Sequence, residues 1–171
     1  MANALEISAE TVKEYLGYAE DSYLLYSINK FDYSLRKQLA NPKKIYCLDT
    51  GMINAVSFRF SENYGRLLEN LVFIELMRRQ SEVYYHKRMY ECDFLIKMNH
   101  RITGAIQVTK ELKLDNRKRE LEGLLEAMKA HDLQEGLILT RDTADMIEID
   151  GRKILIKPVW KWLLEEEHSS L

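Results

Sequence analysis

The spacing of apolar positions changes between residues 63 and 109. From Asn63 to Gln80, apolar side chains recur with the period of a helix, which predicts one helix there. The next stretches alternate apolar and polar side chains, which predicts short strands near 83–87, 91–97 and 103–109. One helix followed by three strands is therefore expected at the centre of the chain.

Helical and extended patterns continue toward the C-terminus. A charged helix is expected over 115–131, followed by an apolar strand over 136–140. Residues 146–156 predict a hairpin because Asp150-Gly151 is a type I′ turn signal. A short helix carrying both tryptophans then completes an α/β (α+β) fold with a mixed sheet.

The N-terminal part has a different order of elements. A helix is expected to begin at Ser8 or Thr11, because either residue can cap it. Residues 22–28 and 44–48 have strand character and are expected to pair with each other. A helix followed by a two-stranded wing resembles the last part of a winged helix.

Three polar side chains occupy positions where the pattern predicts an apolar core. Glu69 lies on the apolar stripe of the central helix, and Gln107 lies on the third strand. Strand alternation places Asp93 on the face opposite Cys92 and Phe94. We expect Glu69, Asp93 and Gln107 to converge on one pocket, where two buried carboxylates need a partner, a proton or a metal ion.

The αβββαβ order with these polar positions resembles the restriction-endonuclease-like fold of the PD-(D/E)xK nucleases. Nearly the whole chain resembles the C-terminal region of a family of prokaryotic AAA+ ATPases that carry an uncharacterised nuclease-like domain. The matching stretches are TVKEYL (11–16), KIYCLDTG (44–51), GRLLENLVFIEL (65–76), ECDF (91–94), IQV (106–108) and KWL (161–163). The resemblance implies a partial winged-helix-like segment over 1–58 and a nuclease-like domain over 59–171.

In that superfamily, acidic residues and an ExK pair surround a divalent metal, and the Lys helps to activate water. By position, the resemblance makes Glu69 and Asp93 the metal ligands and Gln107 the Glu of the ExK pair. Thr109 then stands at the Lys position, and the adjacent Lys110 points to the opposite strand face. The catalytic set is therefore degenerate, and Gln107→Glu with Thr109→Lys is expected to raise metal affinity.

Three functions follow from this comparison. The expected one is a non-catalytic nuclease-fold module of an AAA+ ATPase, used for nucleic-acid binding or assembly and holding no cofactor. One alternative is a DNA endonuclease with an altered catalytic set, for which the cofactor would be Mg²⁺. The other alternative is a module that binds only protein. The sequence contains no GxxxxGK[ST] motif, so the chain alone is not expected to hydrolyse ATP.

The net charge of −2 gives no general attraction to nucleic acid, so DNA binding would need a local basic surface. Two groups of basic residues are candidates for contacting phosphates. They are Arg36, Lys37, Lys43 and Lys44 in the connector over 30–44, and Arg117 and Lys118 at the start of the 115–131 helix. The alternative is a solvated connector, and a solvated helix face on which the basic residues pair with Glu120, Glu122 and Glu126.

The sequence also leads to predictions of the cellular location and the oligomeric state. No apolar run is long enough to span a membrane and no signal-peptide core occurs, so we expect a cytoplasmic location and no membrane partner. The early helices of a winged helix are absent, which we interpret as a fragment or a shortened gene product. Apolar surface that those helices would cover is then exposed, and a homo-oligomer is expected.

Overall fold

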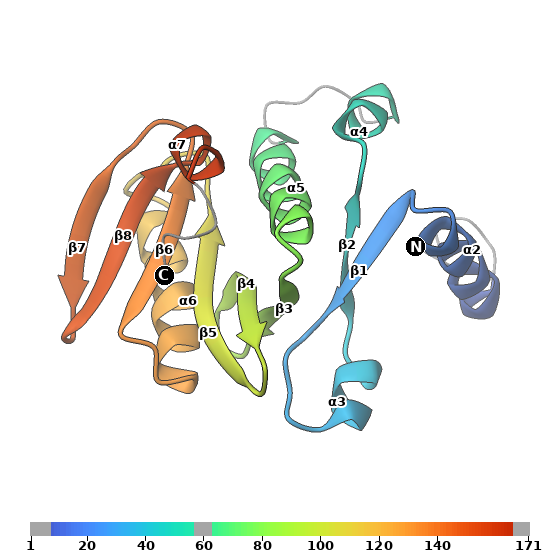
Figure 1. The fold of residues 1–171 in the computed structure, drawn as a ribbon, viewed down its shortest axis with the longest axis horizontal. Helices are drawn as coiled ribbons and strands as arrows, with labels where there is room; N and C mark the ends of the chain where they lie inside the picture. The colour runs from blue at the N-terminus through green and yellow to red at the C-terminus, as the bar shows by residue number, and fades with distance from the viewer. Residues whose placement is uncertain (1–7, 57–62, 166–171) are drawn as a thin grey trace.

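The computed structural model describes residues 8–56 and 63–165. An N-terminal part precedes a body built on one large sheet (Figure 1). The N-terminal elements are α2 (Ala9–Asp21), β1 (Leu25–Asn29), α3 (Leu35–Ala40), β2 (Lys43–Cys47) and α4 (Thr50–Val56). The elements of the body are α5 (Asn63–Arg78), β3 (Glu82–Lys87), β4 (Glu91–Met98), β5 (Arg101–Val108), α6 (Arg117–Ala130), β6 (Glu135–Thr140), β7 (Asp145–Ile149), β8 (Arg152–Pro158) and α7 (Val159–Leu163).

The body is a six-stranded mixed sheet in the order β3-β4-β5-β6-β8-β7. Strand β4 is antiparallel to both β3 and β5, β6 is parallel to both β5 and β8, and β7 is antiparallel to β8. Two hydrophobic clusters show which helix covers which face. One cluster contains residues of α5 and α7, and the other contains residues of α6. The sheet therefore lies between α5 with α7 on one face and α6 on the other (Figure 1).

Strands β1 and β2 form an antiparallel two-stranded ribbon beside α5 (Figure 1). Two hydrogen bonds join the side-chain amide of Asn70 on α5 to the backbone N–H and C=O of Cys47 on β2. An isolated bridge joins Lys30 to Tyr85 on β3, and Tyr46 of the ribbon is buried in the core cluster of α5. The ribbon is thus packed onto the body.

The expected mixed α/β class is confirmed. The centre has the element order α5-β3-β4-β5-α6-β6, and the chain continues with the β7–β8 hairpin and the short helix α7. Asp150 and Gly151 both adopt positive φ, as the type I′ turn requires. The N-terminal helix is capped by Ser8, whose side chain accepts from the Thr11 N–H. The expected boundary between residues 58 and 59 lies outside the described residues.

The structure corrects one detail of the N-terminal part. The connector between the ribbon strands contains the short helix α3, which follows Ser34. The sequence pattern did not reveal it because none of its residues is buried, so it has no periodic apolar face to detect.

Candidate functional site

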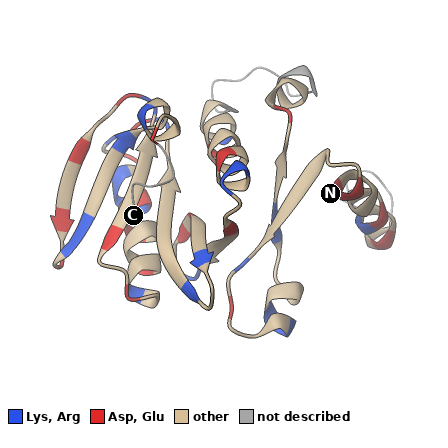
Figure 2. Ribbon diagram, in the orientation of Figure 1, with Lys and Arg blue, Asp and Glu red and all other residues tan. Residues whose placement is uncertain are grey.

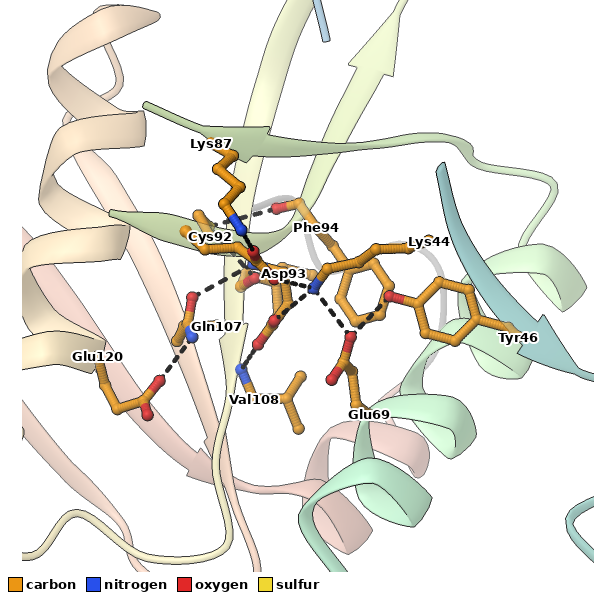
Figure 3. Close-up of polar contacts among 12 residues, drawn as sticks. Lys44, Tyr46, Glu69, Lys87, Cys92, Asp93, Phe94, Gln107, Val108 and Glu120 are labelled. Atoms are coloured by element: carbon orange, nitrogen blue, oxygen red, sulfur yellow. Dashed lines mark hydrogen bonds and ion pairs between the residues drawn. The ribbon is translucent and has the colours of Figure 1, made fainter. Parts of the chain in front are cut away.

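The ammonium group of Lys44 lies at the centre of a cluster of carboxylates (Figure 3). Its Nζ is 2.8 Å from Oδ1 of Asp93, 2.8 Å from Oε1 of Glu91 and 3.1 Å from Oε1 of Glu69. The three carboxylates come from α5 and β4, whereas Lys44 comes from β2. The ribbon therefore supplies the cation for an acidic group on the body.

An irregularity in β4 sets the position of Asp93. Two residues of β4, Asp93 and Phe94, stand opposite the single residue Tyr85 of β3. This is the arrangement of a β-bulge, which redirects side chains. The flanking Cys92 and Leu95 both pack in the cluster of α6, whereas Phe94 packs in the cluster of α5. The expected alternation, with Asp93 and Leu95 sharing a face opposite Cys92 and Phe94, is wrong for this reason.

Glu69 lies on the core-facing stripe of α5, as the periodicity predicted. Its Oε1 accepts from the Tyr46 hydroxyl at 2.7 Å as well as from Lys44. The ring of Tyr46 is stacked on Phe73 of α5, with 4.3 Å between ring centroids. Lys44 and Tyr46 are two residues apart on β2 and so face the same side. One strand face therefore delivers both donors to Glu69.

The charges of the cluster perturb one another. Burial, followed by the charge of Glu69, raises the pKa of Asp93 to about 7, even though Lys44 and the Val108 N–H, which donates to Oδ2 at 2.9 Å, oppose this shift. Burial alone would lower the pKa of Lys44, but Asp93 and Glu69 outweigh it and raise the pKa above its usual value. Near neutral pH, Asp93 is therefore only partly ionised beside a charged Lys44.

Glu91 is the third carboxylate, and it takes part in two ion pairs. It contacts Lys44 through Oε1 and Lys87 through Oε2, the latter at 2.9 Å. Burial opposes ionisation, but the hydrogen bond and charge of Lys44, then those of Lys87, hold the pKa of Glu91 below its usual range. Glu91 thus stays ionised and completes the surroundings of the Lys44 ammonium.

Gln107 does not join this group, contrary to the expected convergence. Its Nε2 donates to Oε2 of Glu120 on α6 at 2.6 Å, and its Oε1 accepts from the Asp93 N–H at 3.3 Å. Figure 3 shows Gln107 and Glu120 on the side of β5 away from Glu69. The strand alternation that aims Ile106 and Val108 at α5 aims Gln107 at α6.

The other positions of the expected ExK pair are also occupied by structural contacts. The Thr109 hydroxyl donates to the Glu111 backbone oxygen at 3.3 Å, and the Lys110 ammonium lies over the Tyr64 ring, 5.5 Å from its centroid. Glu120, expected on a solvated face, is 4% exposed. It pairs with both Gln107 and Arg119. Glu120 is thus a buried residue that pairs with the exposed Arg119 of the same helix turn.

The predicted nucleic-acid residues divide into two classes. Arg36, Lys37, Lys43, Arg117 and Lys118 are exposed, as a phosphate contact requires. Lys44 is not: its side chain is 19% exposed and turned into the carboxylate cluster. The expectation that Lys44 contacts nucleic acid is therefore corrected, because the alternation of β2 points it toward α5 while Lys43 points outward.

The carboxylates around Lys44 are the residues that would have to hold the divalent metal of a nuclease. One oxygen of each carboxylate already contacts the Lys44 ammonium. Among residues 8–56 and 63–165, no cluster of three or more His, Cys, Asp or Glu side chains has the geometry to hold a metal ion. As arranged, these residues do not fit Mg²⁺, because its ligands would have to release Lys44 first.

Sequence reasoning did not assign Tyr46, Glu91 or the inward role of Lys44. The alternation of Lys44 and Tyr46 on β2 was a usable signal, because both face the helix that carries Glu69. The pairing itself joins residues far apart in the chain, and no local pattern predicts it.

In the described part of the chain, no helix has both the length and the apolar content to cross a bilayer.

Known proteins resemble this chain over most of its length. A family described as a domain of unknown function, DUF8612, matches residues 1–63. Uncharacterized protein MJ1544 of Methanocaldococcus jannaschii is 38% identical over 170 residues, which cover 93% of this chain and 37% of the relative. An uncharacterized protein of Haemophilus influenzae is 28% identical over 159 residues, which cover 92% of this chain and 38% of the relative. The chain spans little more than a third of the length of these curated relatives.

Proposed function

We propose that this chain is a non-catalytic module with a nuclease-like core, which serves nucleic-acid binding or assembly in a longer ATPase-containing protein. The observation that carries the proposal is the Lys44 ammonium within 2.8–3.1 Å of one oxygen from each of Glu69, Glu91 and Asp93. A tethered ammonium supplies the positive charge that these carboxylates need, so the acidic group serves to fix the ribbon on the body.

The length of the relatives is compatible with the ATPase part of the proposal. More than half of each relative lies outside the region that matches this chain, which leaves room for a further domain. Because this sequence contains no GxxxxGK[ST] motif, the proposal puts ATP hydrolysis outside the region that matches this chain.

The nucleic-acid part of the proposal rests on exposed basic side chains. The only charged residues of α3 are Arg36 and Lys37, and both are exposed (Figure 2). Arg117 and Lys118 are exposed in the first turn of α6. Contacts of this kind bind phosphates without reading base sequence, so binding should weaken steeply as salt rises.

The assembly part of the proposal concerns a second copy of this chain. Helix α2 buries none of its residues, although Tyr15 and Tyr18 are large apolar side chains. Leu39 on α3 and Ile45 on the outer side of β2 are also exposed. Exposed apolar side chains on neighbouring elements favour self-association.

A second candidate is a metal-dependent endonuclease with an altered catalytic set. One observation favours it: Lys44 brings a lysine ammonium next to Glu69 and Asp93, where the sequence pattern has Thr109 in place of Lys. On this interpretation, Lys44 would take the role of the missing lysine once a metal had entered.

Plasmid nicking in Mg²⁺ or Mn²⁺ separates the two candidates. The non-catalytic proposal predicts no nicking by the wild type and none by Asp93→Ala. It also predicts that Mn²⁺ raises the melting temperature of Lys44→Ala, whose carboxylates have lost their cation, and leaves that of the wild type unchanged. Wild-type nicking that disappears in Asp93→Ala would establish the endonuclease.

Gel retardation at low salt tests the binding part with single-stranded, duplex and branched DNA. Arg117→Ala with Lys118→Ala, and separately Arg36→Ala with Lys37→Ala, should weaken binding and reduce its salt dependence by about one phosphate contact for each lost charge. Lys129→Ala is the control, since Lys129 is exposed but paired with Asp150. No retardation of any DNA would leave assembly as the role of the module.

A further inference from the structure

One aromatic side chain of the connector that follows β1 packs on the body, in addition to the hydrogen bond that the Tyr85 hydroxyl donates to the Pro42 backbone oxygen. The Phe31 ring contacts Tyr84 of β3 and His131 at the end of α6, with centroid distances of 5.3 and 5.1 Å and nearly perpendicular planes. The Phe31 N–H donates to the backbone oxygen of Tyr85 at 2.9 Å. Phe31 therefore links the ribbon to β3 and α6 at one point, separate from the carboxylate cluster.

His131 is the unusual member of this contact. Its Nδ1 is buried and has no hydrogen-bond partner, and its ring also meets that of His86 at 5.9 Å. A neutral imidazole can keep this nitrogen as an unprotonated acceptor at moderate cost. An imidazolium would place a second N–H donor there without an acceptor and bury its charge, which costs considerably more.

The charged groups around His131 do not stabilise its protonated form. On β3, His86 bonds Oε1 of Glu126 through Nε2 at 2.9 Å, and Oε2 of the same carboxylate accepts from the Met89 N–H. Glu126, on α6, is therefore already engaged. The remaining charges facing the two histidines are cationic, namely Arg88 after β3 and Lys30 directly after β1.

We propose that Phe31 and His131 form a proton-sensitive clasp, in which protonation of His131 releases the connector and loosens the ribbon while the body stays folded. The imidazolium is repelled by Arg88 and is stabilised by hydration. The ring contact between His131 and Phe31 therefore opens, so that water can reach the imidazolium. Lys44 lies on strand β2 of the ribbon. Opening of the clasp at low pH is therefore expected to weaken the contact of Lys44 with the carboxylates of the body.

The direction of the pH dependence follows from the burial of His131. Burial, then the charges of His86 and Arg88, lowers the pKa of His131 to about 4, below the value of 6.5 for a free imidazole. The closed clasp therefore binds the proton less well than the open one. The contribution of neutral His131 to closure is fully present above pH 6.5 and is lost as the pH falls from 6.5 toward 4.

Hydrogen exchange of the full chain tests the clasp. The reporter is the Phe31 amide, and the reference is the Lys153 amide, which donates to the Gln134 backbone oxygen in the body. After correction for the intrinsic exchange rate, the protection of Phe31 relative to Lys153 should fall about tenfold between pH 7.5 and pH 5.0. Constant relative protection over this range would overturn the proposal.

Two variants assign the effect to His131. His131→Phe keeps a ring edge against Phe31 and cannot titrate, so the fall in protection should disappear. His100→Gln removes an exposed histidine in the turn between β4 and β5 and should leave the fall unchanged. A fall that persists in His131→Phe would show that another group drives the opening. The His131 ring can also be titrated by NMR in the wild type, and a midpoint near 6.5 would overturn the proposal without any variant.

Discussion

Lys44 Nζ lies 2.8 Å from Oδ1 of Asp93, although 49 positions separate the two residues in the chain. The contact joins the ribbon to the body, and both groups are largely removed from solvent, with exposed side-chain fractions of 19% and 9%. A buried pair of this kind contributes little net stability as a pair, but removing one partner leaves the other charge stranded.

Lys44→Met should therefore lower the free energy of unfolding by about 3 kcal/mol, the low end for a broken buried pair, because Lys44 keeps some contact with water. The loss should be larger at pH 8 than at pH 5. The folded-state pKa of Asp93 is about 7 and lies above its ordinary value of 3.8, so its contribution favours folding at low pH and is lost as pH rises. Without Lys44 this pKa rises further. Urea unfolding at both pH values measures the difference.

Lys43→Met is the matched control for this variant. Lys43 is the neighbouring residue on β2, is exposed, and contacts only the Ser27 hydroxyl at 3.3 Å among its hydrogen-bond partners in the described residues. The same chemical change should cost less than about 0.5 kcal/mol there. Equal losses for the two variants would show that the carboxylate cluster does not depend on Lys44.

The position of Gln107 reverses an expectation from the sequence. Gln107→Glu together with Thr109→Lys was expected to strengthen metal binding, but the Gln107 side chain contacts Glu120 at 2.6 Å instead of Glu69. Both residues are buried, so a second carboxylate there should cost about 1–3 kcal/mol of stability and leave metal affinity unchanged. Chemical denaturation, and calorimetric titration with Mg²⁺, would measure the two quantities.

Adding Glu120→Gln to Gln107→Glu reverses the donor and the acceptor of this bond. The double variant should recover at least half of the lost stability, because one carboxylate again faces one amide. The contact of Glu120 with Arg119 is lost in the exchange, so full recovery is not expected. Additive losses in a double-mutant cycle would show that the two side chains do not interact.

The sequence predicted the elements of the body better than the contacts of the site. Glu69 was placed correctly because helical periodicity is local and α5 keeps a regular geometry. The predicted strand face of Asp93 relative to Phe94 was wrong, because the bulge in β4 can be recognised only when the pairing of β4 with β3 is known. Lys44 was read as a surface residue because its partners are contributed by elements that follow it at long range.

The close approach of α6 to β4 provides a test of how the site is supported. A Cβ added at Gly123 would lie 2.1 Å from the backbone oxygen of Glu91. Gly123→Ala must therefore push α6 away from the strand that carries Glu91 and Asp93, at a cost of about 3 kcal/mol, the upper end for an overpacked core. Thermal unfolding monitored by circular dichroism measures this loss.

Gly17→Ala is the contrasting variant. Gly17 lies inside α2, and a Cβ there meets nothing within 4 Å. The same substitution should stabilise α2 by about 0.5–1 kcal/mol, because alanine loses less backbone freedom in a helix than glycine does. Gly123→Ala with wild-type stability would mean that α6 does not press on Glu91 as the structure shows.

The exposed apolar side chains of the N-terminal part lead to the last prediction. Tyr18 of α2 and Leu39 of α3 are 66% and 63% exposed. Burying such side chains against a second copy is favourable, so the chain should self-associate with rising concentration. Sedimentation equilibrium should give a mass above the 20.2 kDa of one chain, and Tyr18→Glu with Leu39→Glu should return it to that value. Met89→Glu, at a residue of the body that is 83% exposed, should leave the association unchanged. A wild type that stays monomeric at the highest concentration would show that this apolar surface does not bind a second copy.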